Sequence, residues 1–186
     1  MVGLTDLWLP IILSAVIVFV ASAIVHMALR YHWKDNDPLP GEDAVREAMR
    51  KQGVGPGDYI VPHAGSPAAM KDPELLKKFE EGPVGFFTIL PSGPPAMGKS
   101  LILWFIYSLA IGVMVAYVTG RTVAPGTEYL RVFRVAATVA FLAYAGAEPI
   151  SSIWRGRKWS TTLKNVFDGL IYAWLTGGVF GWLWPN

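Results

Sequence analysis

The chain has 186 residues, of which 53% are hydrophobic and 13% aromatic, while only 16% are charged. These values are typical of a membrane protein. A formal net charge of +2, with the basic residues spread over several segments, argues against nucleic-acid binding. Because the chain contains no cysteine, disulfides, thiolate nucleophiles and cysteine metal sites are excluded.

The first predicted element is an apolar helix over Leu7–Leu29, which is long enough to cross a hydrocarbon core about 30 Å thick. Within it, the small residues of Ala21–Ala23 are typical of a signal-peptide cleavage site. However, Met1–Asp6 carries no positive charge, and the apolar run has the length of a full span. We therefore expect an uncleaved first membrane helix.

The long segment at residues 31–98 has start and stop signals of its own. Glu42–Gln52 is predicted to be an amphipathic helix, and a second helix follows the N-cap residue Asp72. Strands are expected at Asp58–Pro62 and Val84–Leu90, which are bounded by glycine and proline. The segment is therefore predicted to be a small α+β insertion between the first two membrane helices.

Gly93–Ser100 has the spacing GxxxxGKS of a phosphate-binding P-loop. Such a loop requires a soluble helix after it and an extended parallel sheet before it. Here an apolar span follows, and at most two strands precede. We expect an ordered loop that leads into the second span, with Lys99 at the membrane surface. Nucleotide binding is not expected, and the sequence identifies no other cofactor.

Three further apolar stretches follow the insertion, at Leu101–Val118, Val132–Ile153 and Leu163–Trp184. Each contains small residues at intervals of three or four, which allow membrane helices to approach closely. We expect these stripes to pack within the chain or against another subunit, and the longest stripe to be the preferred docking face. The longest stripe consists of Gly169, Ala173, Gly177 and Gly181.

These elements predict an all-α membrane protein, a four-helix transmembrane bundle with a small α+β cytoplasmic insertion between helices 1 and 2. Residues 1–30 are assigned to helix 1, residues 31–98 to the insertion and residues 99–186 to helices 2 to 4. Nine Lys and Arg residues lie in the segment from Arg30 to Lys99, and neither terminus has any. The positive-inside rule then places the long loop in the cytoplasm and both termini outside, in a bacterial inner membrane.

Glu148 and Asp168 lie within predicted spans, where an ionised side chain is costly and usually has a partner. Pro149 predicts a kink or a break at the first acid. A short connection between the last two spans brings both acids to one level, and His26 reaches about the same depth. We expect these residues to form a polar cluster. Its expected charge partners are Arg155, Arg157, Lys158 and Lys164.

The other histidines are His32 and His63. His26 and His32 are six positions apart, which would put them on different sides of a continuous helix, and His63 lies in a predicted loop. Because this spacing does not form a ligand motif, no metal site is expected.

Two functions follow from this sequence. The preferred one is a structural or accessory subunit of a larger membrane complex, with contacts to lipid, to other subunits or to a second copy. The alternative is a proton, ion or metal site that is built from His26, Glu148 and Asp168 near the cytoplasmic membrane face and serves transport or a membrane enzyme. No nucleophile or redox motif accompanies these residues, so the sequence names no reaction and favours a protein without enzymatic activity.

Overall fold

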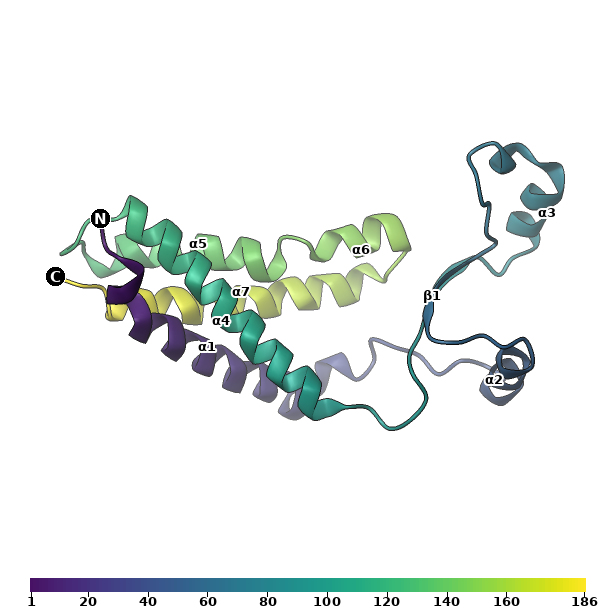
Figure 1. Cartoon of the computed structure of the whole chain (residues 1–186), viewed down its shortest axis with the longest axis horizontal. Coiled ribbons are helices and arrows are strands. Elements are labelled where there is room, and N and C mark those ends of the chain that lie inside the picture. Colours follow the sequence, from purple (N-terminus) through teal and green to yellow (C-terminus); the bar gives the residue numbers. More distant parts are fainter. The chain divides into compact units, whose positions relative to one another are not determined.

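The computed structural model describes residues 1–186 without gaps. The chain divides into two compact units. The bundle unit comprises Met1–Asn36 and Ala96–Asn186, and the insertion unit comprises Asp37–Pro95. The bundle unit is helical, whereas the insertion unit contains both helices and strands (Figure 1).

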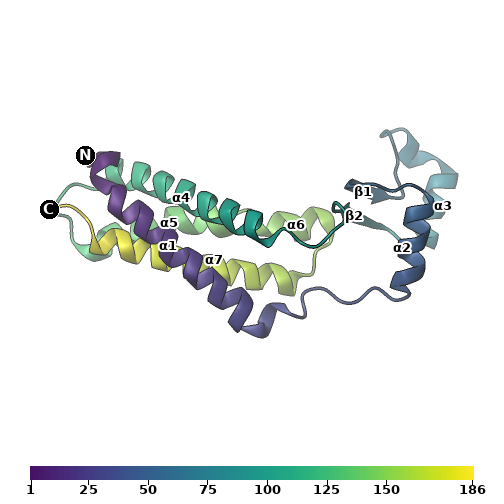
Figure 2. The same ribbon diagram turned by 60° about the horizontal axis from the view of Figure 1, so that its bottom comes forward.

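Four long helices lie alongside one another in the bundle unit, and a short helix follows the third of them (Figure 2). A 3₁₀ turn at Leu4–Leu7 precedes the first helix, and a π-helical turn at Ile24–Ala28 follows it. The helices are α1 (Trp8–Ala23), α4 (Met97–Thr122), α5 (Tyr129–Ala145), α6 (Glu148–Arg155) and α7 (Trp159–Trp182).

Three helical segments are long and apolar enough to cross a membrane: Leu4–Ala28, Met97–Thr122 and Tyr129–Arg155. The fourth predicted span coincides with α7, which has 24 residues but is not among these candidates. Its Thr, Gly and Asp residues make it less apolar than the other three. Helix α7 contacts α1, α5 and α6, and polar residues such as Thr162 and Asp168 are buried. An enclosed helix does not need the apolarity of one that is surrounded by lipid.

The small-residue stripe of α7 packs against α5. A Cβ atom added to Gly169 would lie 2.8 Å from Ala145 Cβ, and one added to Gly177 would lie 2.7 Å from Ala137 Cβ. Ala173, in the middle of the stripe, is fully buried. Because α5 occupies this face, the expectation that the stripe is a docking face for another subunit is wrong. The small residues instead bring two helices of one chain into close contact.

The apolar core of the bundle lies near the two chain termini, which are at the same end of the bundle unit (Figure 1). Leu7, Val132 and Phe180 are fully buried there. Polar contacts close this end, since the Trp184 indole N–H donates to the carbonyl oxygen of Ala124 at 3.0 Å. At the opposite end of the bundle, side chains far apart in the sequence are hydrogen-bonded to one another, among them Tyr31 with Asp168 and Arg157 with Glu148.

The insertion unit has two helices, α2 (Glu42–Lys51) and α3 (Pro73–Glu81), and two strands, β1 (Gly57–Val61) and β2 (Gly85–Ile89). All four lie within a residue or two of their predicted bounds. The strands pair antiparallel, and α3 begins where Asp72 accepts a hydrogen bond from the Glu74 backbone N–H at 3.0 Å.

The segment with P-loop spacing lacks the surroundings of a nucleotide site. The strand before it belongs to a two-stranded antiparallel sheet. Its Lys99 and Ser100 lie in the first turn of the apolar helix α4. Both features agree with the argument against nucleotide binding.

Candidate functional site

The chain changes direction at the end of α1, and this change positions the first part of the site. After the π-helical turn, Leu29 is extended with φ −89° and ψ 105°, and Arg30–His32 then forms a 3₁₀ turn. The rings of His26 and His32 consequently lie with their centroids 4.7 Å apart. The expectation that they lie on different sides of a continuous helix is wrong, because the helix ends between them.

Asp168 on α7 is the most enclosed acidic group of the site, with 5% of its side chain exposed. One of its carboxylate oxygens accepts a hydrogen bond from the Tyr31 hydroxyl, and the other lies 2.8 Å from His32 Nε2. The second ring nitrogen of His32, Nδ1, lies 2.6 Å from Asp35 Oδ2. The partners of Asp168 therefore come from the segment after α1 and not from the basic residues around α6.

Lys164 on α7 holds this segment in place. Its ammonium group donates to Asp35 Oδ1 at 2.5 Å and to the backbone oxygen of Tyr31 at 2.6 Å. Burial alone would raise the pKa of Asp35, but the hydrogen bonds from Lys164 and His32 outweigh burial and keep this pKa below its usual value. Burial and the bond to Asp168 raise the pKa of the Tyr31 phenol, which stays protonated as a donor.

Glu148 is positioned by an interruption between α5 and α6. Helix α5 ends at Ala145, and α6 begins at Glu148 with Pro149 in its first turn, so the helix breaks where the proline predicts. Glu148 Oε2 accepts hydrogen bonds from Arg157 Nη1 at 3.0 Å and from Asn165 Nδ2 at 2.8 Å.

The four basic residues expected near the acids have different positions. Arg157 contacts Glu148, whereas Lys164 contacts Asp35. Arg155 ends α6 with an exposed side chain, and Lys158 is exposed immediately before α7.

The three residues of the expected cluster, His26, Glu148 and Asp168, all line one cavity of about 250 Å³. Its other walls are largely aromatic and include Trp104 and Tyr172. A second cavity, of about 590 Å³, is lined by His26 and by polar residues that include His32, Asp35 and Arg157. His26 thus lies between a partly aromatic cavity and a polar one, whereas His32 lines the polar cavity alone.

Three of these side chains are of the types that bind metal ions. One nitrogen each of His26 and His32 and one oxygen of Asp168 lie within 4.8 Å of one another. Imidazole and carboxylate groups are the usual ligands of divalent metals and are also the usual carriers of protons. The geometry can therefore hold a cation among three side chains from three helical segments.

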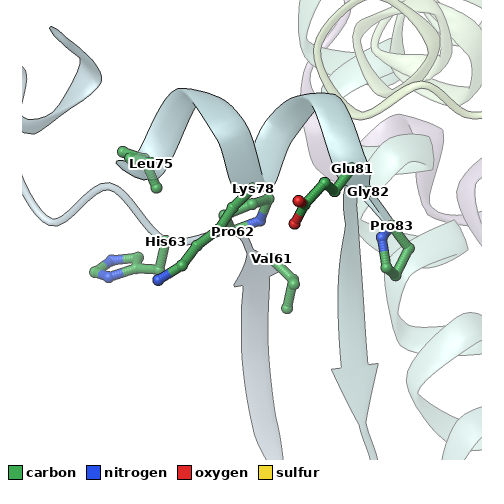
Figure 3. A pocket seen from close by; sticks show the side chains of 8 residues that line it. All are labelled: Val61, Pro62, His63, Leu75, Lys78, Glu81, Gly82 and Pro83. Carbon is green, nitrogen blue, oxygen red and sulfur yellow. The ribbon is translucent and has the colours of Figure 1, made fainter. Parts of the chain in front are cut away.

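The insertion unit contains a cavity of about 290 Å³ between the end of β1 and α3 (Figure 3). Figure 3 shows His63 and the Lys78 amine on one side of it and Glu81 on the other. All three side chains belong to exposed residues. Because water solvates these groups freely, they provide weaker grounds for a site than the enclosed cluster of the bundle unit.

Sequence reasoning missed Tyr31, His32, Asp35 and Asn165 as members of the cluster. The available signal was the position of Tyr31, His32 and Asp35, which follow an apolar span directly and are spaced so that a turn brings them together. The chain matches no protein-family model, no curated protein and no solved structure, so its function is inferred from this geometry.

Proposed function

We propose that the chain is a multi-pass bacterial inner-membrane protein with four spans, a cytoplasmic insertion and both termini outside. Three helices have the length and apolarity of spans. Helix α7 is packed against two of them, so it can supply a fourth crossing while its polar face is shielded from lipid. The Lys and Arg residues between α1 and α4 support this orientation.

The absence of cysteine makes this topology testable, since an introduced cysteine is the only thiol. Ala124, between α4 and α5, and Ala68, in the insertion unit, are both exposed. In intact spheroplasts, a membrane-impermeant maleimide should label Ala124→Cys but not Ala68→Cys, and lysis should make both reactive. Labelling of Ala68→Cys but not of Ala124→Cys before lysis would show that the protein has the opposite orientation.

The function that the bundle supports best is binding of a small cation at the polar cluster. The observation that carries this proposal is the pairing of Asp168. Its carboxylate is almost completely enclosed, yet it contacts only a phenol and an imidazole, and no Lys or Arg side chain. Glu148, in contrast, has Arg157. A carboxylate without a permanent cationic partner gains most from an additional positive charge.

Thermal unfolding of the detergent-solubilised protein in different chloride salts tests this proposal. A cation that binds the folded state at a hundred times its Kd adds about 2.7 kcal/mol of stability. We expect at least one of Na⁺, K⁺, Mg²⁺, Ca²⁺, Zn²⁺ and Co²⁺ to stabilise the wild type much more than Asp168→Asn. Asp43→Asn, at a fully exposed position, is the matched control and should respond like the wild type. Equal responses of all three proteins to every salt would reject cation binding.

An accessory role in a larger membrane complex is a second candidate. In the three apolar helical segments, only 28% to 39% of the most apolar stretch is buried within the chain. Their outer faces are therefore free for lipid or for neighbouring subunits. This role predicts that Asp168→Asn and Glu148→Gln alter assembly or stability. A cation site at Asp168 predicts that both variants fold and assemble normally and that Asp168→Asn loses the cation-dependent stabilisation. Native mass spectrometry together with the salt series separates the two functions.

A further inference from the structure

His32 lies between two carboxylates, and this arrangement limits which charges the site can hold. A neutral imidazole has one N–H and can donate to only one acceptor. If Nδ1 donates to Asp35 at 2.6 Å, Nε2 directs a lone pair toward the Asp168 oxygen 2.8 Å away. Two lone pairs at this distance repel each other unless a proton or a metal ion lies between them.

The contact between Asp35 and His32 resembles the outer shell of a metal site. A metal-ligating histidine usually donates its other ring N–H to a carboxylate, which fixes the ring and makes the ligating nitrogen more basic. Here Asp35 is itself held by the Lys164 ammonium group at 2.5 Å. On the other side, the Tyr31 hydroxyl binds one oxygen of Asp168 and leaves the second oxygen directed at His32. Both potential ligands therefore have fixed orientations.

His26 completes a set of three donors. Its ring contacts that of His32 but makes no hydrogen bond, so both of its nitrogens are available. The donor atoms of the three residues lie within 4.8 Å of one another, whereas ligands of one metal ion are about 3 to 3.5 Å apart. His26 is exposed and lies in a π-helical turn, so a ring rotation and a small shift of this residue can close the difference.

We propose that His26, His32 and Asp168 bind one divalent transition-metal ion, an inference that rests on the cation-binding function proposed above. Two imidazoles and one carboxylate suit Zn²⁺, Fe²⁺, Co²⁺ or Ni²⁺, whereas Mg²⁺ and Ca²⁺ prefer oxygen ligands throughout. Two of the three ligands, His26 and Asp168, also line the 250 Å³ cavity, as does Glu148. The 590 Å³ cavity, whose lining includes the exposed residue Lys158, provides access for the ion.

Metal titration of the full chain, purified without a histidine tag and stripped with chelator, tests the inference. Calorimetry with ZnCl₂ should give one equivalent per chain, and the visible spectrum of bound Co²⁺ should report mixed nitrogen and oxygen ligands. Asp35→Asn removes the carboxylate behind His32 without removing a ligand, and it should weaken binding about 10- to 100-fold. His26→Ala is expected to fold, since this side chain makes no hydrogen bond, and should weaken binding by at least as much as Asp35→Asn.

His63→Ala is the matched control because it removes a histidine from the insertion unit, outside the cluster. It should leave the stoichiometry and affinity unchanged. Loss of affinity in His63→Ala equal to that in His26→Ala would overturn the assignment, as would wild type that binds neither Zn²⁺ nor Co²⁺. If the wild type binds neither Zn²⁺ nor Co²⁺ but is stabilised by Na⁺, K⁺, Mg²⁺ or Ca²⁺ through Asp168, the transition-metal inference fails while the proposed cation function stands. If no cation does so, both fail.

Discussion

Close packing between α5 and α7 makes Gly177→Ala the most informative test of the fold. The new Cβ would lie 2.7 Å from Ala137 Cβ and 3.0 Å from the Ala137 backbone nitrogen, whereas ordinary van der Waals contact begins at 3.4 Å. Neither neighbouring atom can rotate away, so relief requires the two helices to separate. Overpacking of this kind costs about 1–3 kcal/mol, and the gain in helix propensity from glycine to alanine, about 1 kcal/mol, offsets part of it.

The expected net result is a loss of up to about 2 kcal/mol, measured by SDS-induced unfolding of the detergent-solubilised protein and followed by far-UV circular dichroism. Gly98→Ala is the matched control. A Cβ at Gly98, in the first turn of α4, meets no atom within 4 Å. That variant should be as stable as the wild type or more stable. Equal stability of Gly177→Ala and Gly98→Ala would refute the close contact and leave the α7 stripe open to another subunit.

Two further variants test the two ends of the bundle by the same unfolding assay. Lys164→Met should lower stability by roughly 1–3 kcal/mol, because Asp35, with 11% of its side chain exposed, loses its charge partner; no loss would show that this ion pair is weak. Trp184→Phe should cost about 1 kcal/mol through the lost hydrogen bond to Ala124. Trp182→Phe, at a position with 72% exposure, should be nearly neutral, and similar losses for both tryptophans would contradict a specific role of that bond.

Elements with local signals were predictable from the sequence. The helix after Asp72 begins where this N-cap residue predicts, and both strands lie between the expected glycines and prolines. The break before Glu148 follows from Pro149, because proline disfavours helical geometry in the residue before it. In each case the determining residues are adjacent in the sequence to the helix end, strand or break that they specify.

The composition of α7 gave a less accurate prediction because its environment depends on other helices. Its apolar residues predict a span, but its Thr, Gly and Asp residues lower its apolarity below that of the other three. Those polar residues are tolerated because α1 and α5 cover them. Hydropathy measures a segment by itself, whereas the burial of Asp168 depends on contacts across the bundle.

The turn after α1 was not predictable for the same physical reason. Ile24–Ala28 contains no glycine or proline, and its sequence alone favours a continuous helix. The structure shows contacts that can replace the lost helical hydrogen bonds, since Tyr31 and His32 bind Asp168 and the Tyr31 carbonyl accepts from Lys164. These contacts join residues more than 130 positions apart. A pattern confined to the first span contains no information about them.

The separation of the two ends of the bundle has a consequence for function. The apolar core near the termini and the contacts of α5 with α7 do not involve His26 or His32. Changes at these histidines therefore remove potential ligands while most of the buried apolar surface stays intact. The segment after α1 is held mainly by polar contacts to Lys164 and Asp168. A positive charge placed between His32 and Asp168 would strengthen those contacts, so cation binding and ordering of this segment should occur together.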